Sequence, residues 1–373
     1  MRYGIGIDFV PHTYTSTTPN ILFIILLSMF YAVKLTKKNI SGHSSVVERL
    51  VANEKVEGSN PFARSIKNIV NNQNLATKLF QKYIDKKDIR IFKGNIFYYL
   101  YYRLSRSFFN EPLKVKINNF NLFSNHRKNK TSHSLLQKCN FFDVSEINTI
   151  KKLNNSYQLF LIDCGCNFGF YSFYTASLSN ENEIISIEAS KSTFEEFSNN
   201  LRINNFKNIK FFNKAVSDQN NKKMEFHESE KDWESSLLSS KFSIKQKNLV
   251  DSITIDSVLE NKNINNRLLI LKIDVEGADF NVLEGAKTTI QKNKPFIIIE
   301  FSKYIFKNER FNYDYLLNFT TTNDYQIYNK NGHKFSVEEI LKLLKDLDKV
   351  HDTIGNYYLI SNNRMDLVEK IFN

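Results

Sequence analysis

Residues 159–171 of this chain read LFLIDCGCNFGFY, and this stretch decides the fold. The apolar run Leu159–Ile162 is short and uninterrupted, which is typical of an inner strand of a parallel sheet. Asp163 ends the predicted strand, and the glycines after it allow a sharp turn and a close approach to a ligand. A helix is expected from Phe170 to Leu178, with free N–H groups at its start. The stretch therefore predicts a small-molecule site at the carboxyl end of a central strand of an α/β sheet.

The spacing of this loop excludes the common phosphate-binding motifs. A dinucleotide fingerprint needs Gly-x-Gly-x-x-Gly and a P-loop needs Gly-Lys-Ser/Thr, whereas residues 163–169 follow the pattern Asp-x-Gly-x-Asn-x-Gly. An acid at the strand end would repel a pyrophosphate and suits a positively charged ligand. Glu188 follows the next apolar run, Ile184–Ile187, where a carboxylate can bind both hydroxyls of a ribose. A ribose beside a positive charge indicates S-adenosylmethionine.

The pattern of alternating strands and helices continues beyond this site. A helix is predicted from Ser192 to Asn204, with Ser192 as its N-cap and Glu195 three residues later. Further strands are expected at Ile209–Phe212, Leu268–Ile273 and Phe296–Ile299. Four predicted strands end in an acid: Asp163, Glu188, Asp274 and Glu300. Alternating strands and helices imply a parallel sheet with right-handed crossovers, and the acids indicate a polar site along one edge of it.

The ordered motifs resemble the FkbM family of S-adenosylmethionine-dependent methyltransferases. The resemblance covers roughly residues 115–362, and its most specific parts are Lys272–Gly277 and Leu283–Ala286. It implies the class I methyltransferase fold, a Rossmann-like, doubly wound, mostly parallel seven-stranded sheet with an antiparallel last strand. Tyr325–Tyr328 and Asn356–Ile360 are the candidates for its final hairpin. The resemblance also implies O-methylation of a hydroxyl on a sugar, glycan or secondary metabolite.

The candidate site residues divide between the methyl donor and the acceptor. We expect the donor's methionine part at Asp163, Gly165, Asn167 and Gly169, its ribose at Glu188, and its adenine amino group at Asp218 and the backbone before it. Asp274 should lie closest to methyl transfer, and its role as base, acceptor guide or contact of the donor's amino group is left open. His227 is a second candidate base, against the alternative of a solvated loop histidine.

The chain offers little for a metal or a disulfide framework. It has three cysteines, and Cys164 and Cys166 form Cys-x-Cys with only Cys139 besides them. A zinc site would need histidine or carboxylate ligands as well, so no metal is predicted. Cys164 and Cys166 also stand where the family has small aliphatic residues, and both are small enough to fit. Free thiols favour a reducing compartment, and a cytoplasmic location is expected.

The first 66 residues look unlike a protein segment. The apolar run Ile21–Val33 is shorter than the about 20 residues that a membrane span needs. Gly58–Pro61 back-translates to the T-arm of a transfer RNA gene, and Ser44–Glu48 back-translates to a D-arm. We therefore expect residues 1–66 to be a non-native or disordered leader. Since no methionine occurs between Met29 and Met224, a natural start downstream would use an alternative codon.

Residues 67–114 are predicted to be a helical aromatic and basic extension of a methyltransferase domain at 115–373. Residues 95–109 place basic side chains among aromatics, which suits peripheral membrane contact or packing against the domain. The net charge is +12, but the lysines are scattered and indicate no clear nucleic-acid partner. The acceptor is expected to be a small molecule or glycan.

Two other functions stay open. One is a nucleic-acid (RNA) methyltransferase, although the Asp/Asn-Pro-Pro-Tyr/Phe loop of base-amino methylation is replaced by Asp274–Gly277. The other is a non-catalytic protein that keeps the fold.

Overall fold

The computed structural model describes residues 113–117, 119–124, 143–229, 244–264, 266–302, 304, 313–347 and 353–373. The chain forms two compact units, Met1–Leu79 and Phe80–Asn373, and the described elements belong to the second. The predicted leader 1–66, most of the extension 67–114 and the membrane contact at 95–109 lie outside the described residues. Among the helices that the structure describes, none is long and apolar enough to cross a membrane.

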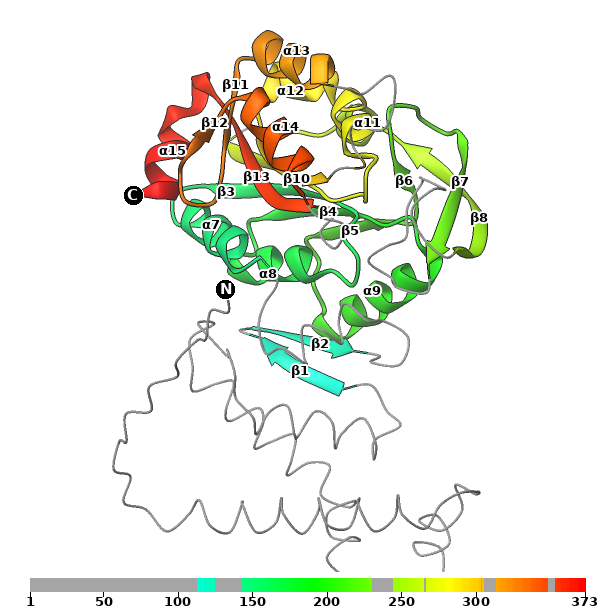
Figure 1. The fold of residues 1–373 in the computed structure, drawn as a ribbon. Helices are drawn as coiled ribbons and strands as arrows, with labels where there is room; N and C mark the ends of the chain where they lie inside the picture. The colour runs from blue at the N-terminus through cyan, green and yellow to red at the C-terminus, as the bar shows by residue number, and fades with distance from the viewer. Residues whose placement is uncertain are drawn as a thin grey trace, which may run out of the picture. The chain divides into compact units, whose positions relative to one another are not determined.

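A mixed sheet of eight strands forms the centre of the domain, in the order β12-β11-β13-β10-β9-β3-β4-β5 (Figure 1). Five neighbouring strands are parallel: β10 (Phe296–Ser302), β9 (Arg267–Ile273), β3 (Gln158–Cys164), β4 (Glu183–Ile187) and β5 (Ile209–Phe212). β13 (Thr353–Ser361) lies antiparallel between β10 and β11 (Tyr325–Tyr328). The predicted doubly wound sheet with an antiparallel last strand is confirmed.

The eighth strand differs from the predicted seven. β12 (Lys334–Phe335) is a two-residue edge strand that pairs with β11. It forms because the turn between them closes on itself, with the Asn329 side chain accepting from the backbone N–H groups of Asn331 and His333. So short a strand carries too little periodicity to be recognised in the sequence.

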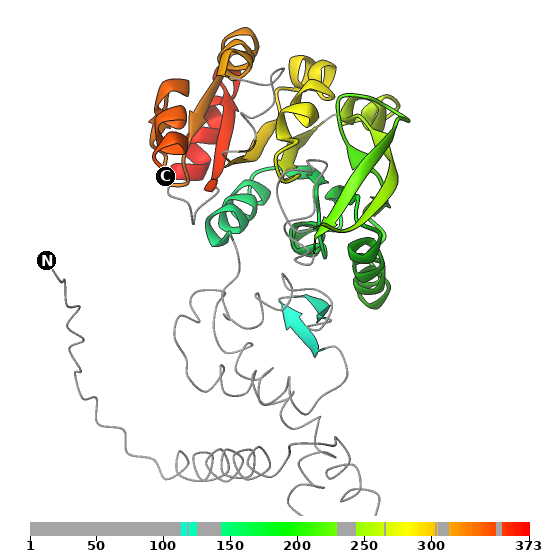
Figure 2. The same ribbon diagram turned by 45° about the vertical axis from the view of Figure 1, so that its right-hand side comes forward.

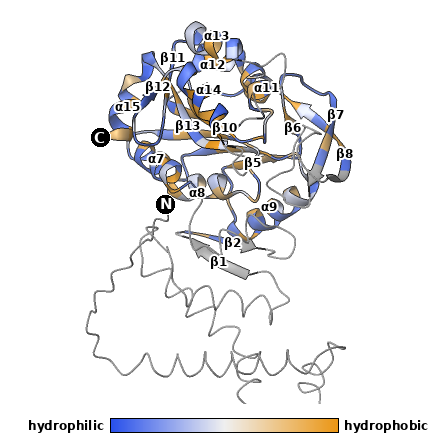
Figure 3. Cartoon of the chain, viewed as in Figure 1, coloured by the Kyte–Doolittle hydropathy of each residue, from blue (hydrophilic) through white to orange (hydrophobic). Residues whose placement is uncertain are grey.

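Helices cover both faces of the sheet. One face carries α7 (Val144–Asn154), α8 (Phe170–Leu178), α9 (Lys191–Asn204) and α15 (Met365–Phe372), the last entered through a short 3-10 turn, Asn362–Arg364. The other carries α10 (Ile255–Leu259), α11 (Asp279–Glu284), α12 (Lys287–Asn293), α13 (Tyr313–Asn323) and α14 (Val337–Lys345). Because both faces are covered, the inner strands are apolar throughout, and Figure 3 shows the hydrophobic colour on central strands such as β10.

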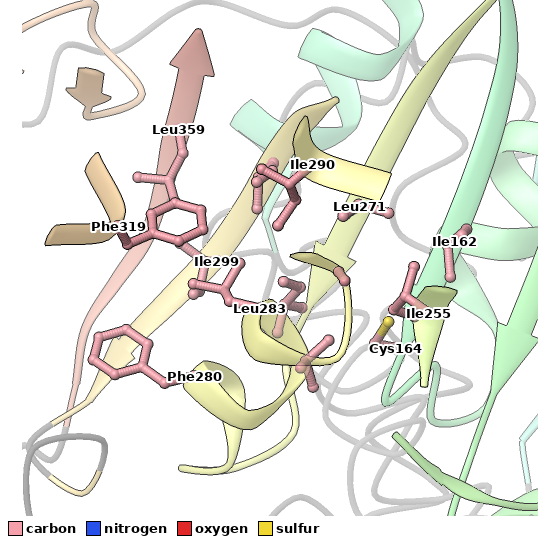
Figure 4. Close-up of a cluster of buried hydrophobic side chains, with 14 of the residues drawn as sticks. Ile162, Cys164, Ile255, Leu271, Phe280, Leu283, Ile290, Ile299, Phe319 and Leu359 are labelled. Atoms are coloured by element: carbon pink, nitrogen blue, oxygen red, sulfur yellow. The ribbon is translucent and has the colours of Figure 1, made fainter. Parts of the chain in front are cut away.

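Alternate strand residues supply two separate hydrophobic cores. On β3, Phe160 and Ile162 face α10 to α14, whereas Leu159 and Leu161 face α7, α8 and α15. Figure 4 shows the first core, where strand residues such as Ile299 meet helix residues such as Phe280. Each fully buried side chain of this kind contributes roughly 1.5–3 kcal/mol relative to exposure. These cores fix the register of the strands and therefore the places where the strands end.

Two strands run further than the sequence predicts. β3 continues to Cys164 because Asp163 and Cys164 pair with Ser186 and Ile187 of β4. β10 continues to Ser302 because β13 extends the ladder beyond Ile299. The expectation that Asp163 and Glu300 end their strands is therefore wrong, since both lie inside a ladder.

The helix predictions hold with one correction. Phe170–Leu178 is α8, as expected, but α9 begins at Lys191 and its N-cap is Ser190. Ser190 has extended backbone angles, and its hydroxyl accepts from the N–H of Thr193. The predicted cap, Ser192, already lies inside the helix. Near the C-terminus, α14 begins with a capping box that Ser336 and Glu339 form.

Two small sheets flank the central one. β6 (Ala215–Val216), β8 (Ile244–Ile253) and β7 (Lys223–Ser229) form a three-stranded sheet, in which the β7–β8 hairpin stands at the side of the domain (green, at the right of Figure 2). β1 (Leu113–Ile117) and β2 (Phe120–Ser124) form an antiparallel pair. Phe120 of that pair packs against Phe170 and Phe173 of α8. Leu113 and Lys114, the last residues of the predicted helical extension, thus lie in a strand.

Candidate active site

The loop between β3 and α8 is fastened to the end of β4. The N–H groups of Gly165 and Cys166 both donate to the carbonyl of Ile187, at 2.9 and 3.1 Å. Asn167 and Gly169 have left-handed backbones, with φ of 50° and 95°, and Gly169 is the N-cap of α8. The Asn167 side chain accepts from the N–H of Phe168 at 2.8 Å. The loop therefore has a fixed, sharply turned backbone of the kind that approaches a ligand closely.

Glu188 lies directly beside this loop. Its Oε2 accepts from the N–H of Asn167 at 2.9 Å, and its Oε1 accepts from the N–H of Ser190 at 2.8 Å. Burial raises the pKa of Glu188 to about 7, although both backbone hydrogen bonds act against the rise. Each carboxylate oxygen can accept a second hydrogen bond. The Glu188 carboxylate can therefore accept two further hydrogen bonds, for example from the two hydroxyls of a ribose.

Asp163 has a more enclosed position than its neighbours. It is 2% exposed, and its Oδ2 accepts from the hydroxyl of Ser172 at 2.5 Å. The hydroxyls of Ser172 and Ser186 lie 2.7 Å apart, so α8, β3 and β4 meet in one hydrogen-bond chain. Burial raises the pKa of the Asp163 carboxyl to about 6. In this structure Asp163 anchors the start of α8 beneath the loop, and a direct ligand contact stays a prediction.

Gly165 joins the loop to the end of β9. Its φ is +74°, and a Cβ at this position would lie 2.0 Å from the carbonyl oxygen of Asp274. The N–H of Asp274 donates to the carbonyl of Cys164 at 3.1 Å. Only glycine fits this close approach. As a result, Asp274 is held next to the β3–α8 loop, and its part in methyl transfer stays a prediction.

The turn after β9 is held by an aspartate that the sequence analysis missed. Asp279, 2% exposed, accepts from the N–H groups of Val275 and Gly277 at 3.3 and 3.0 Å. Between these two, Glu276 adopts a left-handed backbone with φ of 56°. Burial raises the pKa of the Asp279 carboxyl to about 6. The signal was an acid in the first turn of a helix directly after a glycine turn.

A buried lysine neutralises Asp274. Lys272 is 1% exposed, and its Nζ lies 3.0 Å from Asp274 Oδ2. The same ammonium lies 5.3 Å from the ring centre of Tyr171, whose hydroxyl donates to Asp143 at 2.8 Å. Burial alone would lower the pKa of Lys272, but the carboxylates of Asp274 and Asp143 outweigh it and raise that pKa above its usual value. Lys272 is therefore a permanent cation at the end of β9.

Glu300 completes an acidic group at the ends of β9 and β10. Carboxylate oxygens of Asp274, Glu276 and Glu300 lie within 4.8 Å of one another. Burial and the nearby carboxylates of Asp274 and Glu276 raise the pKa of Glu300 to about 9. Glu276 and Glu300 therefore both lie beside Asp274.

The segment expected to bind adenine, Ser217 and Asp218, is held in place by α11. Gly285 lets α11 approach it, because a Cβ at Gly285 would lie 2.1 Å from the carbonyl oxygen of Ser217. Asp218 follows, and its Oδ1 accepts from the Ser217 hydroxyl at 2.9 Å and the Asn281 side chain at 3.2 Å. The close approach of Gly285 to Ser217 explains why the motif Leu283–Ala286 contains a glycine.

His227 does not join the acidic group. It lies on β7 in the three-stranded sheet, and its Nε2 is 3.3 Å from Glu225. Its Nδ1 is buried without a hydrogen-bond partner among the described residues. Its catalytic role stays a prediction. Cys164 and Cys166 are free, buried thiols, and burial raises the pKa of both.

The sheet order, with its antiparallel strand beside β10, and the loop site beside Glu188 define a class I S-adenosylmethionine-dependent methyltransferase. A model of the methyltransferase FkbM domain matches residues 163–350, half of the chain, and the chain belongs to that family. S-adenosylmethionine is accordingly its methyl donor. This confirms the fold, the enzyme class and the donor predicted from the sequence.

Solved structures with the same type of fold are only distantly similar. A methyltransferase from Agrobacterium tumefaciens has 9% identity and a TM-score of 0.34, with coverage of 68% of this chain and 70% of that one. An rRNA methylase from Streptococcus thermophilus has 10% identity and a TM-score of 0.33, with coverage of 59% and 98%. No curated protein sequence matches the chain.

Proposed function

We propose that this methyltransferase transfers a methyl group to a hydroxyl of a sugar, glycan or secondary metabolite. The observation that carries the proposal is the position of Asp274, a partly exposed carboxylate held against the donor loop by Gly165 and oriented by Lys272. A neutral hydroxyl becomes a better nucleophile when a base within hydrogen-bond reach takes its proton. Asp274 is the base, or the residue that orients the acceptor.

The proposed donor site follows the geometry of the loop. The backbone of Gly165, Asn167 and Gly169 lies against the methionine part, above the anchor that Asp163 forms. Glu188 accepts both ribose hydroxyls on its remaining lone pairs, and Asp218 receives the adenine amino group. The donor, when bound, supplies a methyl group that is already electrophilic on its sulfonium. The protein's task is then mainly to hold the donor and the acceptor in line.

Replacing Asp274 by asparagine is expected to lower the methyl-transfer rate about 100-fold or more, because the amide cannot take a proton. The affinity for S-adenosylmethionine, measured by calorimetry, should change less than about threefold, because the donor is held mainly at Glu188 and the loop. Asp314→Asn, at an exposed position of α13, is the matched control and should behave as wild type. A large loss of donor affinity in Asp274→Asn would assign Asp274 to the donor's amino group instead.

Donor affinity is expected to depend on the ionisation of Glu188, whose pKa is about 7. As the pH falls through 7, the carboxylate gains a proton and becomes a weaker acceptor for the ribose. The dissociation constant should therefore rise roughly tenfold between pH 8 and pH 6, in line with the ionised fraction. Glu188→Gln should bind weakly at both values. A wild-type affinity that is constant over this range would contradict the ribose assignment.

The acceptor class is tested with labelled donor. Purified protein and methyl-labelled S-adenosylmethionine are added to extracts of the source cells, and the products are separated into glycan, glycolipid, small-molecule and RNA fractions. Label in a glycan or small molecule, released as a methyl ether on analysis, is expected. Label in RNA would overturn the acceptor proposal. Donor binding without any labelled product would favour a non-catalytic protein.

A further inference from the structure

The acidic group formed by Asp274, Glu276 and Glu300 extends away from the donor loop. Asp274 follows β9, and Glu300 lies on β10, where Ile299 is the register partner of Ile273. β9 separates β10 from β3, so Glu300 lies about two strand spacings, roughly 10 Å, from the strand that carries the donor loop. The group formed by Asp274, Glu276 and Glu300 therefore lies on the side of the site away from Glu188.

One buried oxygen beside Glu300 has no partner in the part of the chain that the structure describes. Asn356 is the register partner of Glu300 across the β10–β13 ladder, and its Oδ1 is buried without a hydrogen bond. Buried polar atoms are nearly always paired, and leaving one unpaired costs about 1–3 kcal/mol.

Together these groups have the chemistry of a site for a hard cation. Three carboxylates whose oxygens lie within 4.8 Å of one another can share one ion, and the amide oxygen of Asn356 is a further donor of the same type. Oxygen ligands of this kind select Mg²⁺, Mn²⁺ or Ca²⁺ over softer metals. Lys272 binds Oδ2 of Asp274. Such an outer hydrogen bond orients a ligating carboxylate and leaves its second oxygen for the ion.

We propose that Asp274, Glu276 and Glu300, with Asn356 beside them, bind a divalent cation of the Mg²⁺ or Mn²⁺ type that holds the hydroxyl acceptor. This inference rests on the proposed function, because it gives the acceptor side of the same site its ligand. A cation at this position binds the acceptor's oxygen directly and lowers the pKa of that hydroxyl, whose proton passes to solvent as the methyl group is transferred. Asp274, with one oxygen on Lys272 and the other on the ion, then orients the acceptor. It also favours acceptors with neighbouring hydroxyls, which can occupy two positions on one ion. No metal was predicted from the sequence, because the only metal motif considered there was the one formed by Cys164 and Cys166.

The test uses Mn²⁺ as the probe and the full-length chain after dialysis against a chelator. Electron paramagnetic resonance measures free Mn²⁺ during titration. The wild-type protein is expected to bind one Mn²⁺ per chain with a dissociation constant below roughly 10⁻⁴ M. Glu300→Gln should weaken this binding at least tenfold. Glu183→Gln is the matched control, since Glu183 is a half-exposed acid at the other end of β4 that pairs with Arg267, and it should bind as wild type.

Two further measurements keep the outcomes distinct. Asn356→Leu removes the neutral oxygen without changing the charge, and it should weaken Mn²⁺ binding with little change in the thermal midpoint. Calorimetry with S-adenosylmethionine on the same samples reports the donor site independently. Intact donor binding by a wild-type protein that takes up no Mn²⁺ would overturn the cation site alone. Equal Mn²⁺ affinity in the wild type and Glu300→Gln would also overturn it, whereas loss of donor binding in the wild type would overturn the proposed function.

Discussion

Gly165→Ala is expected to abolish detectable donor binding and to lower the free energy of unfolding by about 2–5 kcal/mol. Two costs add at this position. The left-handed backbone, with φ of +74°, costs a non-glycine residue about 1–2 kcal/mol. The new methyl group would also lie 2.0 Å from the carbonyl oxygen of Asp274, and relieving such an overlap in a packed site costs about 1–3 kcal/mol. Because the overlap is with backbone, the loop and the end of β9 must separate.

Gly355→Ala is the matched control for this experiment. Gly355 also has a left-handed backbone, with φ of +88°, but a Cβ there would meet nothing within 4 Å. The variant should lose only the conformational cost of about 1–2 kcal/mol and should bind S-adenosylmethionine as wild type does. Urea unfolding and donor calorimetry on both variants separate strain from overlap. Equal losses in the two variants would show that the contact between Gly165 and Asp274 does not matter.

Lys272→Met is expected to have the second largest effect. Methionine is one atom shorter than lysine and keeps most of the packing, but it removes the cation that pairs with Asp274. Breaking a buried pair by removing one partner costs about 3–5 kcal/mol. We expect about 3 kcal/mol, because Asp274 is 36% exposed and keeps some hydration. The methyl-transfer rate should fall at least tenfold, because Asp274 loses the partner that orients it, while Glu188 and the donor loop are unchanged.

Lys287→Met supplies the comparison. Lys287 also pairs with a carboxylate, that of Glu284 at 2.6 Å, but its side chain is 63% exposed. An exposed pair of this kind contributes about 0–1 kcal/mol, and Lys287 lies on α12 away from Asp274. Thermal unfolding and single-turnover methyl transfer on both variants are the measurements. A Lys272→Met protein with wild-type stability and rate would show that the buried cation is dispensable.

The sequence predicted the fold well where a pattern is local. Apolar runs located β3, β4, β5, β9 and β10, because strands buried on both faces need uninterrupted apolar residues. The sequence-based prediction was less accurate where pairing with an adjacent strand decides where a strand ends. Asp163 and Glu300 look like strand ends because they are charged, yet β4 and β13 extend the ladders past them. The same holds for Ser190 and Ser192, since only the backbone angles show which serine precedes the first helical turn.

The candidate site shows the same division. The sequence named Glu188 and Asp274, because an acid after a strand of a parallel sheet reaches the ligand edge whatever surrounds it. It did not identify Asp279 as the residue that holds the turn after β9, or Asn356 as the partner of Glu300 across the ladder. Their importance comes from which backbone groups they meet and which strand they face, and these relations join residues far apart in the chain.

The sequence by itself therefore determined the order of strands and helices, the glycine-hinged loop at 163–169 and the acids along one edge, because these follow from local periodicity and spacing. Only the tertiary structure decided what those acids do. It enclosed Asp163 beneath α8, held Glu188 with two backbone N–H groups, placed a buried Lys272 on Asp274, and brought Glu276 and Glu300 beside it. The physical reason is that burial and charge pairing depend on neighbours across the sheet, which no single stretch of sequence contains.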